Sequence, residues 1–209
     1  MKGLLLKDFL MIKGNVRSVL LFLVVFCLIA LEGNDFLLFV PALISFMMFM
    51  TTFSYDEYNK WDPYAITLAV KRKEIVFAKY LGSFILLFFS LIITFLVALG
   101  IGIYNQNFDL QKTFTLLLGC GASILFLQDI VYPLFIKFGV EKGRIGLFVG
   151  IFLLSFLLGW ILKNVSISIP QDIYSFVVSY LPWILAVFLL ILTIGSYEIS
   201  KKIYTKKEF

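Results

Sequence analysis

Residues 54–80 of the chain are SYDEYNKWDPYAITLAVKRKEIVFAKY, and this stretch decides how the apolar remainder can be arranged. It holds nine of the 31 charged residues in the sequence and separates two apolar runs of nearly bilayer length. A membrane protein that binds nothing here could join those runs with a few residues. The length and the aromatic content of the stretch therefore favour a structured segment on which another protein docks.

The composition indicates the surroundings of the chain. Of its 209 residues, 61% are hydrophobic and only 15% are charged, and the mean hydropathy is +1.00. A soluble domain of this size could not cover its surface with so few polar side chains. The sequence therefore predicts an integral membrane protein of the all-α class.

Several kinds of chemistry are excluded by residues that the sequence lacks. It contains no histidine, which rules out histidine metal sites and the Ser-His and Cys-His forms of catalysis. Cys27 and Cys120 both fall inside apolar runs, so we interpret them as small hydrophobic residues rather than as a disulfide. The phosphate-binding motif G-x-x-x-x-G-K-[ST] is also missing. We expect no metal site, no catalytic residue and no ATP site in this chain.

Apolar stretches that suit membrane helices occur six times. A helix needs about 20 apolar residues to cross the hydrocarbon core, and the first stretch reaches that length only if it begins before Arg17. Four residues separate the first two stretches, which predicts a tight helical hairpin. The expected spans are residues 17–31, 36–53, 81–104, 113–136, 145–162 and 181–200.

The basic residues predict the orientation of these spans. Sixteen of the 18 lysines and arginines fall in the N-terminal stretch, in the segments that follow the second and fourth spans, and in the C-terminal tail. Lys112 and Lys163 fall on the other side. Because basic loops remain in the cytoplasm, we expect both termini to be cytoplasmic in a multi-pass membrane protein.

The residues before the first span have a pattern of their own. Between positions 2 and 13, apolar residues alternate with Lys2, Lys7, Asp8 and Lys13, so a helix here would carry its polar side chains on a narrow face. This arrangement favours a helix that lies at the membrane surface and ends at Gly14-Asn15. The alternative is that the segment extends the first span by about three turns.

Inside the charged stretch, Asp62-Pro63 is typical of a helix start, with aspartate as N-cap and proline at the first helical position. A helix from there to about Leu68 is two turns long and is not stable alone in water. We therefore expect it to bind a partner surface through Trp61, Tyr64 and Leu68. The alternative is a solvated linker whose aromatic side chains lie at the membrane interface.

Asp129 is the one acidic residue placed well inside a span, where it follows Gln128. An intramembrane carboxylate is costly, so such a residue is a hypothesis of function by default. We favour a structural role, in which Asp129 accepts a hydrogen bond from a neighbouring helix at about 10 Å from the cytoplasmic end of its span. The alternative is a transport-linked polar site formed by Gln128 and Asp129.

Two further segments have less specific patterns. Residues 146–150 are GLFVG, and this G-x-x-x-G spacing permits close helix packing although it is common by chance in apolar helices. Residues 163–172 are expected to form an irregular external loop that contains Pro170. The apolar residues 173–180 are expected to form a short separate piece that lies in the outer interface or dips into the membrane and returns.

Taken together, several stretches resemble the membrane-spanning subunits of ABC-2 type transporters, in particular the small permeases of antimicrobial-peptide and phenol-soluble-modulin exporters of Gram-positive bacteria. The resemblance extends over essentially the whole chain. It is carried by Phe53-Ser54-Tyr55-Asp56-Glu57, by Lys60-Trp61-Asp62 and Tyr64, by residues 1–8, by Arg72-Lys73-Glu74-Ile75-Val76 with Lys79-Tyr80, and by residues 133–145.

The resemblance implies one transmembrane domain over residues 1–209, with six membrane helices, an N-terminal elbow helix at about 2–13 and a cytoplasmic coupling helix at about 62–68. It also implies that two such permeases, identical or related, act as a dimer with separate ATP-binding subunits, which bind ATP and Mg²⁺. The residues implied in coupling to the ATPase are Trp61, Asp62, Pro63, Tyr64 and Leu68.

We therefore interpret the chain as the membrane-spanning subunit of an ATP-driven exporter that is not itself an enzyme. The expected cargo is an amphipathic or antimicrobial peptide or a lipid-like molecule, and nucleic acid is not an expected partner. A non-transporting membrane scaffold or immunity protein is an alternative from another class. A third alternative is an intramembrane enzyme. The missing histidines and the lack of an acidic residue three or four positions from Asp129 argue against it.

Overall fold

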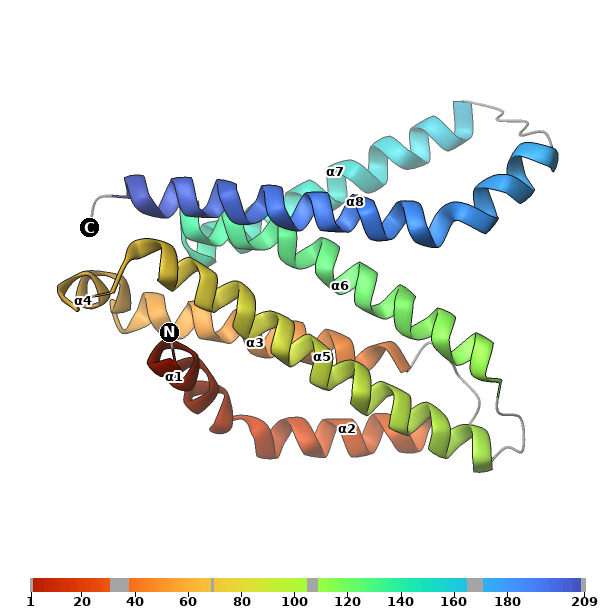
Figure 1. The fold of residues 1–209 in the computed structure, drawn as a ribbon, viewed down its shortest axis with the longest axis horizontal. Helices are drawn as coiled ribbons and strands as arrows, with labels where there is room; N and C mark the ends of the chain where they lie inside the picture. The colour runs from red at the N-terminus through yellow and green to blue at the C-terminus, as the bar shows by residue number, and fades with distance from the viewer. Residues whose placement is uncertain (1, 31–37, 69, 105–108, 165–170, 208–209) are drawn as a thin grey trace.

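A computed structural model describes residues 2–30, 38–68, 70–104, 109–164 and 171–207 (Figure 1). Within these residues the chain forms α-helices and no strand, so the all-α class is confirmed. The helices are α1 (Lys2–Lys13), α2 (Val16–Ala30), α3 (Val40–Tyr58), α4 (Trp61–Thr67), α5 (Arg72–Tyr104), α6 (Leu110–Phe138), α7 (Val140–Asn164) and α8 (Gln171–Lys206).

The six apolar stretches overlap with α2, α3, α5, α6, α7 and α8. Among the described residues, three helices are long and apolar enough to cross a membrane: α5, α6 and the part of α8 over Ile184–Lys206. The pair α1 and α2, bent by 61°, makes a fourth if it is counted as one span. The chain is thus a membrane-embedded helical protein, and the count of six spans stays a prediction. The hairpin expected at 32–35 and most of the loop expected at 163–172 lie outside the described residues.

The segment at 173–180 is not a separate piece, and that prediction is wrong. α8 begins at Gln171 and continues as one helix to Lys206. Figure 1 shows a change of direction near its start but no break. Pro182 lies inside this helix. A proline is tolerated within a membrane helix where local adjustments satisfy the carbonyl groups that it frees. The proline therefore did not mark a helix boundary.

The centre of the molecule consists of α3, α5, α6 and α8. α6 packs along α8, and α3 packs along α5. Tyr132 of α6 is fully buried, and its ring centroid lies 5.2 Å from that of Phe53 in α3 and 5.0 Å from that of Tyr80 in α5. Aromatic pairs at such distances contribute about 0.5–1.5 kcal/mol each beyond the area that they bury. These rings therefore hold three helices together.

The outer helices expose apolar side chains over much of their surface. In α2, Leu21 is 65% exposed, and in α7, Phe148 is 75% exposed. The later turns of α7 also lie apart from α6 in Figure 1. Large apolar faces of this kind are stable against lipid or against another protein, but not against water. They agree with the membrane surroundings that the composition predicts.

Two glycines shape the junction between α6 and α7. Gly139 has a φ of 80°, and a Cβ at this position would lie 2.7 Å from Oε1 of Glu57. Glu57, in the last turn of α3, accepts a hydrogen bond of 2.6 Å from the N–H of Val140 and so satisfies the first turn of α7. At Gly143, a Cβ would lie 2.5 Å from Cδ1 of Phe135, so α6 and α7 approach each other closely there.

The G-x-x-x-G pair has no such role among the described residues. A Cβ added at Gly146 or at Gly150 would meet nothing within 4 Å. The glycine that α7 uses to approach α6 is Gly143, which the sequence spacing did not single out. Packing of Gly146 and Gly150 against another subunit stays a prediction.

We predict that Gly139→Ala destabilises the protein and that Gly146→Ala, the matched control, does not. The first change puts a side chain in a backbone region populated essentially by glycine and against the Glu57 carboxylate, at a cost of about 1–3 kcal/mol. The second adds a methyl group in open space. The measurement is the midpoint of thermal unfolding in one detergent. Equal midpoints for Gly139→Ala and the unmodified chain would contradict the geometry of this junction.

Candidate coupling site

The expected coupling segment forms a helix, but it begins earlier than the sequence predicts. α4 starts at Trp61, after Lys60 has taken a left-handed conformation (φ 49°, ψ 43°) that turns the chain sharply at the end of α3. The residue at the N-cap position is Lys60, which makes no side-chain capping bond. The prediction of Asp62 as N-cap and Pro63 as first helical residue is therefore wrong by two positions.

The carboxylate of Asp62 binds the end of α8 instead of capping α4. Its Oδ1 accepts a hydrogen bond of 3.0 Å from the hydroxyl of Tyr204, and its Oδ2 lies 3.5 Å from Nζ of Lys207. Arg72, the first residue of α5, also donates to the end of α8, at 2.7 Å to the carbonyl of Thr205 and 3.2 Å to that of Lys207. These bonds satisfy carbonyl groups that the last turn of a helix leaves open. The start of α4, the start of α5 and the end of α8 therefore form one unit.

α4 also contacts α3 and α1. Nζ of Lys7 lies 4.3 Å from the centroid of the Trp61 ring, which is a cation–π geometry. Ala65, one turn further along α4, is almost completely buried. The same chain therefore provides part of the surface that this short helix needs. Binding of its remaining surface to another protein stays a prediction.

The outer side of α4 is exposed in the part of the chain that the structure describes. Pro63 is exposed, Tyr64 is 57% exposed and Leu68, directly after the helix, is 36% exposed. The five residues expected to couple to an ATPase thus divide into two groups. Trp61 and Asp62 face the rest of the chain, whereas Pro63, Tyr64 and Leu68 face outward.

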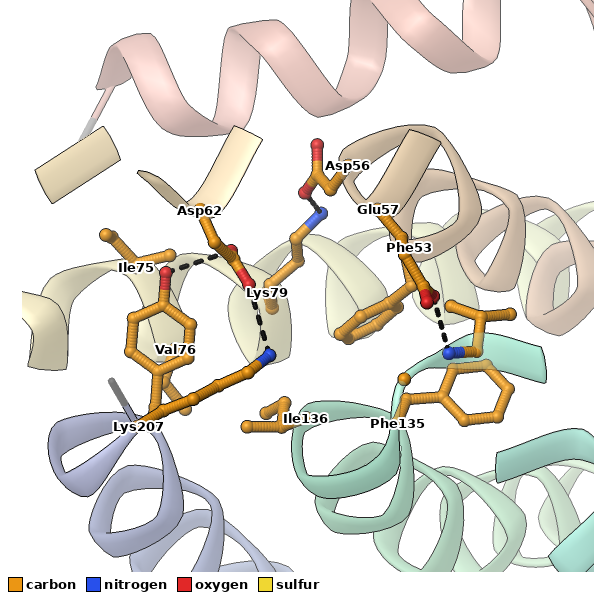
Figure 2. Close-up of a pocket in the computed structure, with 13 residues that line it drawn as sticks. Phe53, Asp56, Glu57, Asp62, Ile75, Val76, Lys79, Phe135, Ile136 and Lys207 are labelled. Carbon is orange, nitrogen blue, oxygen red and sulfur yellow. Dashed lines mark hydrogen bonds and ion pairs between the residues drawn. The ribbon is translucent and has the colours of Figure 1, made fainter. Parts of the chain in front are cut away.

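A cavity of about 110 Å³ lies between α4 and the ends of the central helices (Figure 2). Its volume is enough for a few water molecules. The three carboxylates in its wall are already paired, Asp56 with Lys79, Glu57 with the N–H of Val140, and Asp62 with Tyr204. The lining residues are Phe53, Asp56, Glu57, Asp62, Ile75, Val76, Lys79, Phe135, Ile136, Gly139, Val140, Tyr204 and Lys207.

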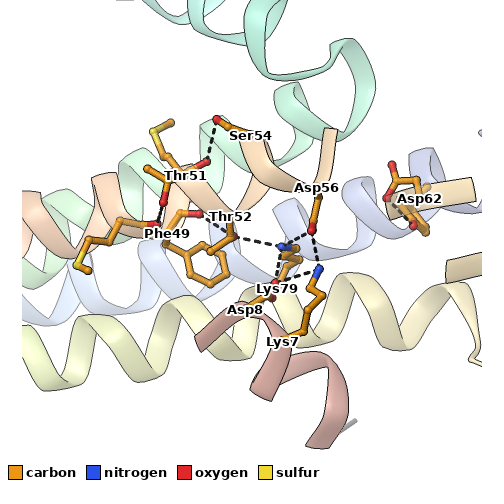
Figure 3. Close-up of polar contacts among 12 residues, drawn as sticks. Lys7, Asp8, Phe49, Thr51, Thr52, Ser54, Asp56, Asp62 and Lys79 are labelled. Carbon is orange, nitrogen blue, oxygen red and sulfur yellow. Dashed lines mark hydrogen bonds and ion pairs between the residues drawn. The ribbon is translucent and has the colours of Figure 1, made fainter. Parts of the chain in front are cut away.

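Next to this cavity, four charged side chains form a cluster that we call the ion cluster (Figure 3). Lys7 and Asp8 come from α1, Asp56 from α3 and Lys79 from α5. Lys79 lies 2.6 Å from Asp56 and 2.9 Å from Asp8, and Lys7 lies 2.6 Å from Asp56 and 3.2 Å from Asp8. Each lysine therefore contacts both aspartates. The hydroxyl of Thr52 accepts a further bond of 3.2 Å from Lys79.

Sequence reasoning missed the ion cluster, because it assigned Lys7 and Asp8 to a polar face at the membrane surface. In the structure Asp8 is buried, on the same side of α1 as Leu4 and Ile12. The spacing of four between these three residues was the available signal, since an acidic residue in the middle of an apolar helical face requires a buried partner. That partner, Lys79, is also buried between apolar neighbours in α5.

Asp129 lies in a second polar contact, between α6, α8 and α5. Its Oδ2 accepts a hydrogen bond of 2.8 Å from the hydroxyl of Thr193, and its backbone carbonyl accepts one of 2.6 Å from Ser196. The hydroxyl of Tyr80 is 2.6 Å from that of Ser196 and 2.9 Å from that of Ser200. We call these residues the polar seam. These bonds favour a structural role of Asp129, which stays a prediction.

Gln128, the other residue of the expected intramembrane site, is also buried. It precedes Asp129 in α6, and the hydrogen bonds described above involve Asp129 alone. A joint transport-linked site of the two residues therefore stays a prediction.

The comparison with protein families gives a clear match. The family described as ABC-2 family transporter protein matches residues 3–205, and the chain belongs to this family. It is accordingly a membrane permease subunit of an ABC transporter, a class that associates with an ATP-binding subunit. No curated protein and no solved structure matches the chain. The ABC-2 assignment is confirmed, and the narrower resemblance to Gram-positive peptide exporters stays a prediction.

We predict that Asp129→Asn leaves folding intact and reduces export only modestly, whereas Asp129→Leu lowers the stability. Asparagine keeps an oxygen that accepts the bond from Thr193, and leucine does not. Hydrogen bonds between membrane helices contribute about 0.6 kcal/mol on average, so the loss in Asp129→Leu is a small but measurable shift of the unfolding midpoint. Export is measured together with the abundance in the membrane. Complete loss of export by Asp129→Asn at normal abundance would assign the carboxylate to transport instead.

Proposed function

We propose that this permease is one of two subunits that form the conduit of an ATP-driven exporter, and that α4 is the helix on which the ATP-binding subunit docks. The partner would bind ATP and Mg²⁺ and hydrolyse the nucleotide. The observation that carries this proposal is the outward face of Pro63, Tyr64 and Leu68, on a short helix whose inner face is fixed by its own chain.

A rigid support matters for such an interface. Exposed aromatic and apolar side chains bind best when they lie on an element that does not have to become ordered upon binding. α4 meets this condition because Trp61 contacts Lys7 of α1 and Asp62 contacts Tyr204 of α8. Figure 1 shows α4 at the tip of one end of the bundle, where it is accessible to a large partner.

The charge distribution supports a cytoplasmic location for that end. The basic residues of α1, of the start of α5 and of the end of α8 lie on helix segments near α4 (Figure 1). Lys112 is in the first turn of α6, at the opposite end of the bundle. By the positive-inside rule, both termini and α4 are in the cytoplasm and the chain crosses the membrane six times.

The proposed cargo is an amphipathic peptide or a similar lipid-like molecule that enters from the cytoplasm or the inner leaflet. The segments that join α2 to α3, α5 to α6 and α7 to α8 are short in sequence, which leaves little chain for capturing a substrate on the outside. The family match counts against the alternative of a scaffold or immunity protein that transports nothing and needs no ATP-binding subunit, because the family is one of transport components.

The topology is tested with single cysteines in a background without Cys27 and Cys120. We predict that a membrane-impermeant thiol reagent labels Gln111→Cys but not Asn59→Cys in intact cells. Both positions are exposed, so the side of the membrane on which each cysteine lies, and not its burial in the protein, decides whether the reagent reaches it. Permeabilised cells are the control, in which both cysteines react. Labelling of Asn59→Cys in intact cells would reverse the proposed orientation.

Docking is tested with the double variant Tyr64→Ala/Leu68→Ala. We predict normal insertion but at least tenfold weaker retention of the ATP-binding subunit, because anchors of this kind contribute on the order of 2 kcal/mol each. Tyr104→Ala is the matched control, since Tyr104 is an exposed tyrosine at the opposite end of the bundle. Retention is measured by co-purification.

Export is measured in the same variants, as ATP-dependent uptake of a labelled amphipathic peptide into inside-out vesicles. A peptide of the same composition with a scrambled, non-amphipathic order is the cargo control. A double variant that keeps the ATP-binding subunit and transports normally would reduce α4 to a linker. An unmodified chain that retains no ATP-binding subunit would favour the scaffold.

A further inference from the structure

The ion cluster joins α1 to α3 and α5. The buried residues of α1 are Leu4, Asp8 and Ile12, so the middle of its inner face is a charge. Leu6 and Leu10, on the other side, are exposed. Apolar side chains alone, here Leu4 and Ile12 with the partly buried Leu5, would allow the helix to slide or rotate on its support, since hydrophobic contacts are not directional. The ion pairs of Asp8 with Lys79 and of Lys7 with Asp56 tie α1 to α5 and α3 and fix its position.

Charge balance is the second property of the ion cluster. Two lysines and two aspartates alternate, so that each charge lies within 3.2 Å of both opposite charges. Removal of one partner leaves a buried charge without compensation, whereas removal of an opposite pair leaves the remaining pair neutral. Apolar residues of similar volume hold helices together equally well or better. The use of ions here therefore points to positioning rather than to stability.

Lys7 connects the ion cluster with α4. Its Nζ is 2.6 Å from Oδ1 of Asp56 and 4.3 Å from the centroid of the Trp61 ring. A displacement of α4 moves this ring relative to the ammonium group. The same ammonium group binds Asp56 and Asp8. Such a displacement therefore changes the ion-pair distances in the whole cluster.

We propose that the ion cluster is an electrostatic latch that docks α1 against α3 and α5, and that Lys7 is the positioning residue that passes a displacement of α4 on to α1. The latch requires only this chain. The transmission step rests on the proposed function, in which α4 binds the ATP-binding subunit.

The latch is tested with a cysteine reporter in purified protein without Cys27 and Cys120. Leu4→Cys reports docking of α1, because Leu4 is only 8% exposed, and Leu6→Cys, at 60% exposed, is the matched control that reacts in every variant. We expect Lys79→Met to increase the labelling rate of the Leu4 reporter at least tenfold. The pair Asp8→Asn/Lys79→Met should restore protection to within about threefold of the unmodified cluster.

Two results of this experiment would overturn the latch: protection of the reporter in Lys79→Met, or a paired variant that reacts as fast as the single variant. If Lys79→Met does not accumulate in the membrane, the abundance of the paired variant Asp8→Asn/Lys79→Met measures the same rescue. A paired variant that does not recover normal abundance would then overturn the latch.

The transmission step is tested with the other pair, Lys7→Met/Asp56→Asn, which leaves Asp8 and Lys79 as a balanced pair at 2.9 Å. We expect a protected Leu4 reporter and at least tenfold slower ATP-dependent uptake of the labelled peptide, normalised to the amount of ATP-binding subunit that the variant retains. Lys7→Arg keeps a cation beside Trp61 and should transport normally. Normal uptake by Lys7→Met/Asp56→Asn, or an equal loss in Asp8→Asn/Lys79→Met, would overturn the role of Lys7. If the unmodified chain retains no ATP-binding subunit, the proposed function fails, and the reporter experiment still decides the latch.

Discussion

Lys7, Asp8, Asp56 and Lys79 hold two positive and two negative charges largely out of water at the end of the bundle that carries α4. The effective cost of such burial is several kcal/mol per ion, and it is offset only when the geometry of the ion pairs is good. Three helices must therefore come within ion-pair distance of one another at the same time. This requirement fixes α1 on α3 and α5, and the position of α4 depends on it because Lys7 also contacts Trp61.

The contacts of α4 give its two aromatic residues different roles. Trp61 belongs to the support of the helix, whereas Tyr64 belongs to its free surface, although the two rings are only 5.4 Å apart. A substitution of Trp61 would therefore loosen α4 itself, and any loss of partner binding would be indirect. The outward residues Tyr64 and Leu68 are the ones whose loss reports docking, because their side chains are exposed in the described part of the chain.

Features that depend on local composition could be predicted from the sequence, namely the all-α membrane class, the positions of the apolar helices and the ABC-2 family. Features that depend on distant partners could not. Lys7 and Asp56 are 49 positions apart, Asp8 and Lys79 are 71 apart, and Asp62 and Tyr204 are 142 apart. Periodicity cannot pair such residues. The start of α4 was misplaced for the same reason, since Asp62 has the chemistry of a cap but binds a tyrosine of α8 instead.

The two polar regions meet at consecutive residues of α5. Lys79 belongs to the ion cluster and faces α1 and α3, and Tyr80 belongs to the polar seam and bonds to Ser196 and Ser200 of α8. α4 contacts both sides, through Trp61 to Lys7 and through Asp62 to Tyr204 in the same α8. Lys79 and Tyr80 are neighbours in one helix and cannot move independently of each other. A shift of α5 at the ion cluster therefore also displaces Tyr80 in the polar seam. Motion of α4 therefore has a direct structural connection to the helix contacts around Asp129.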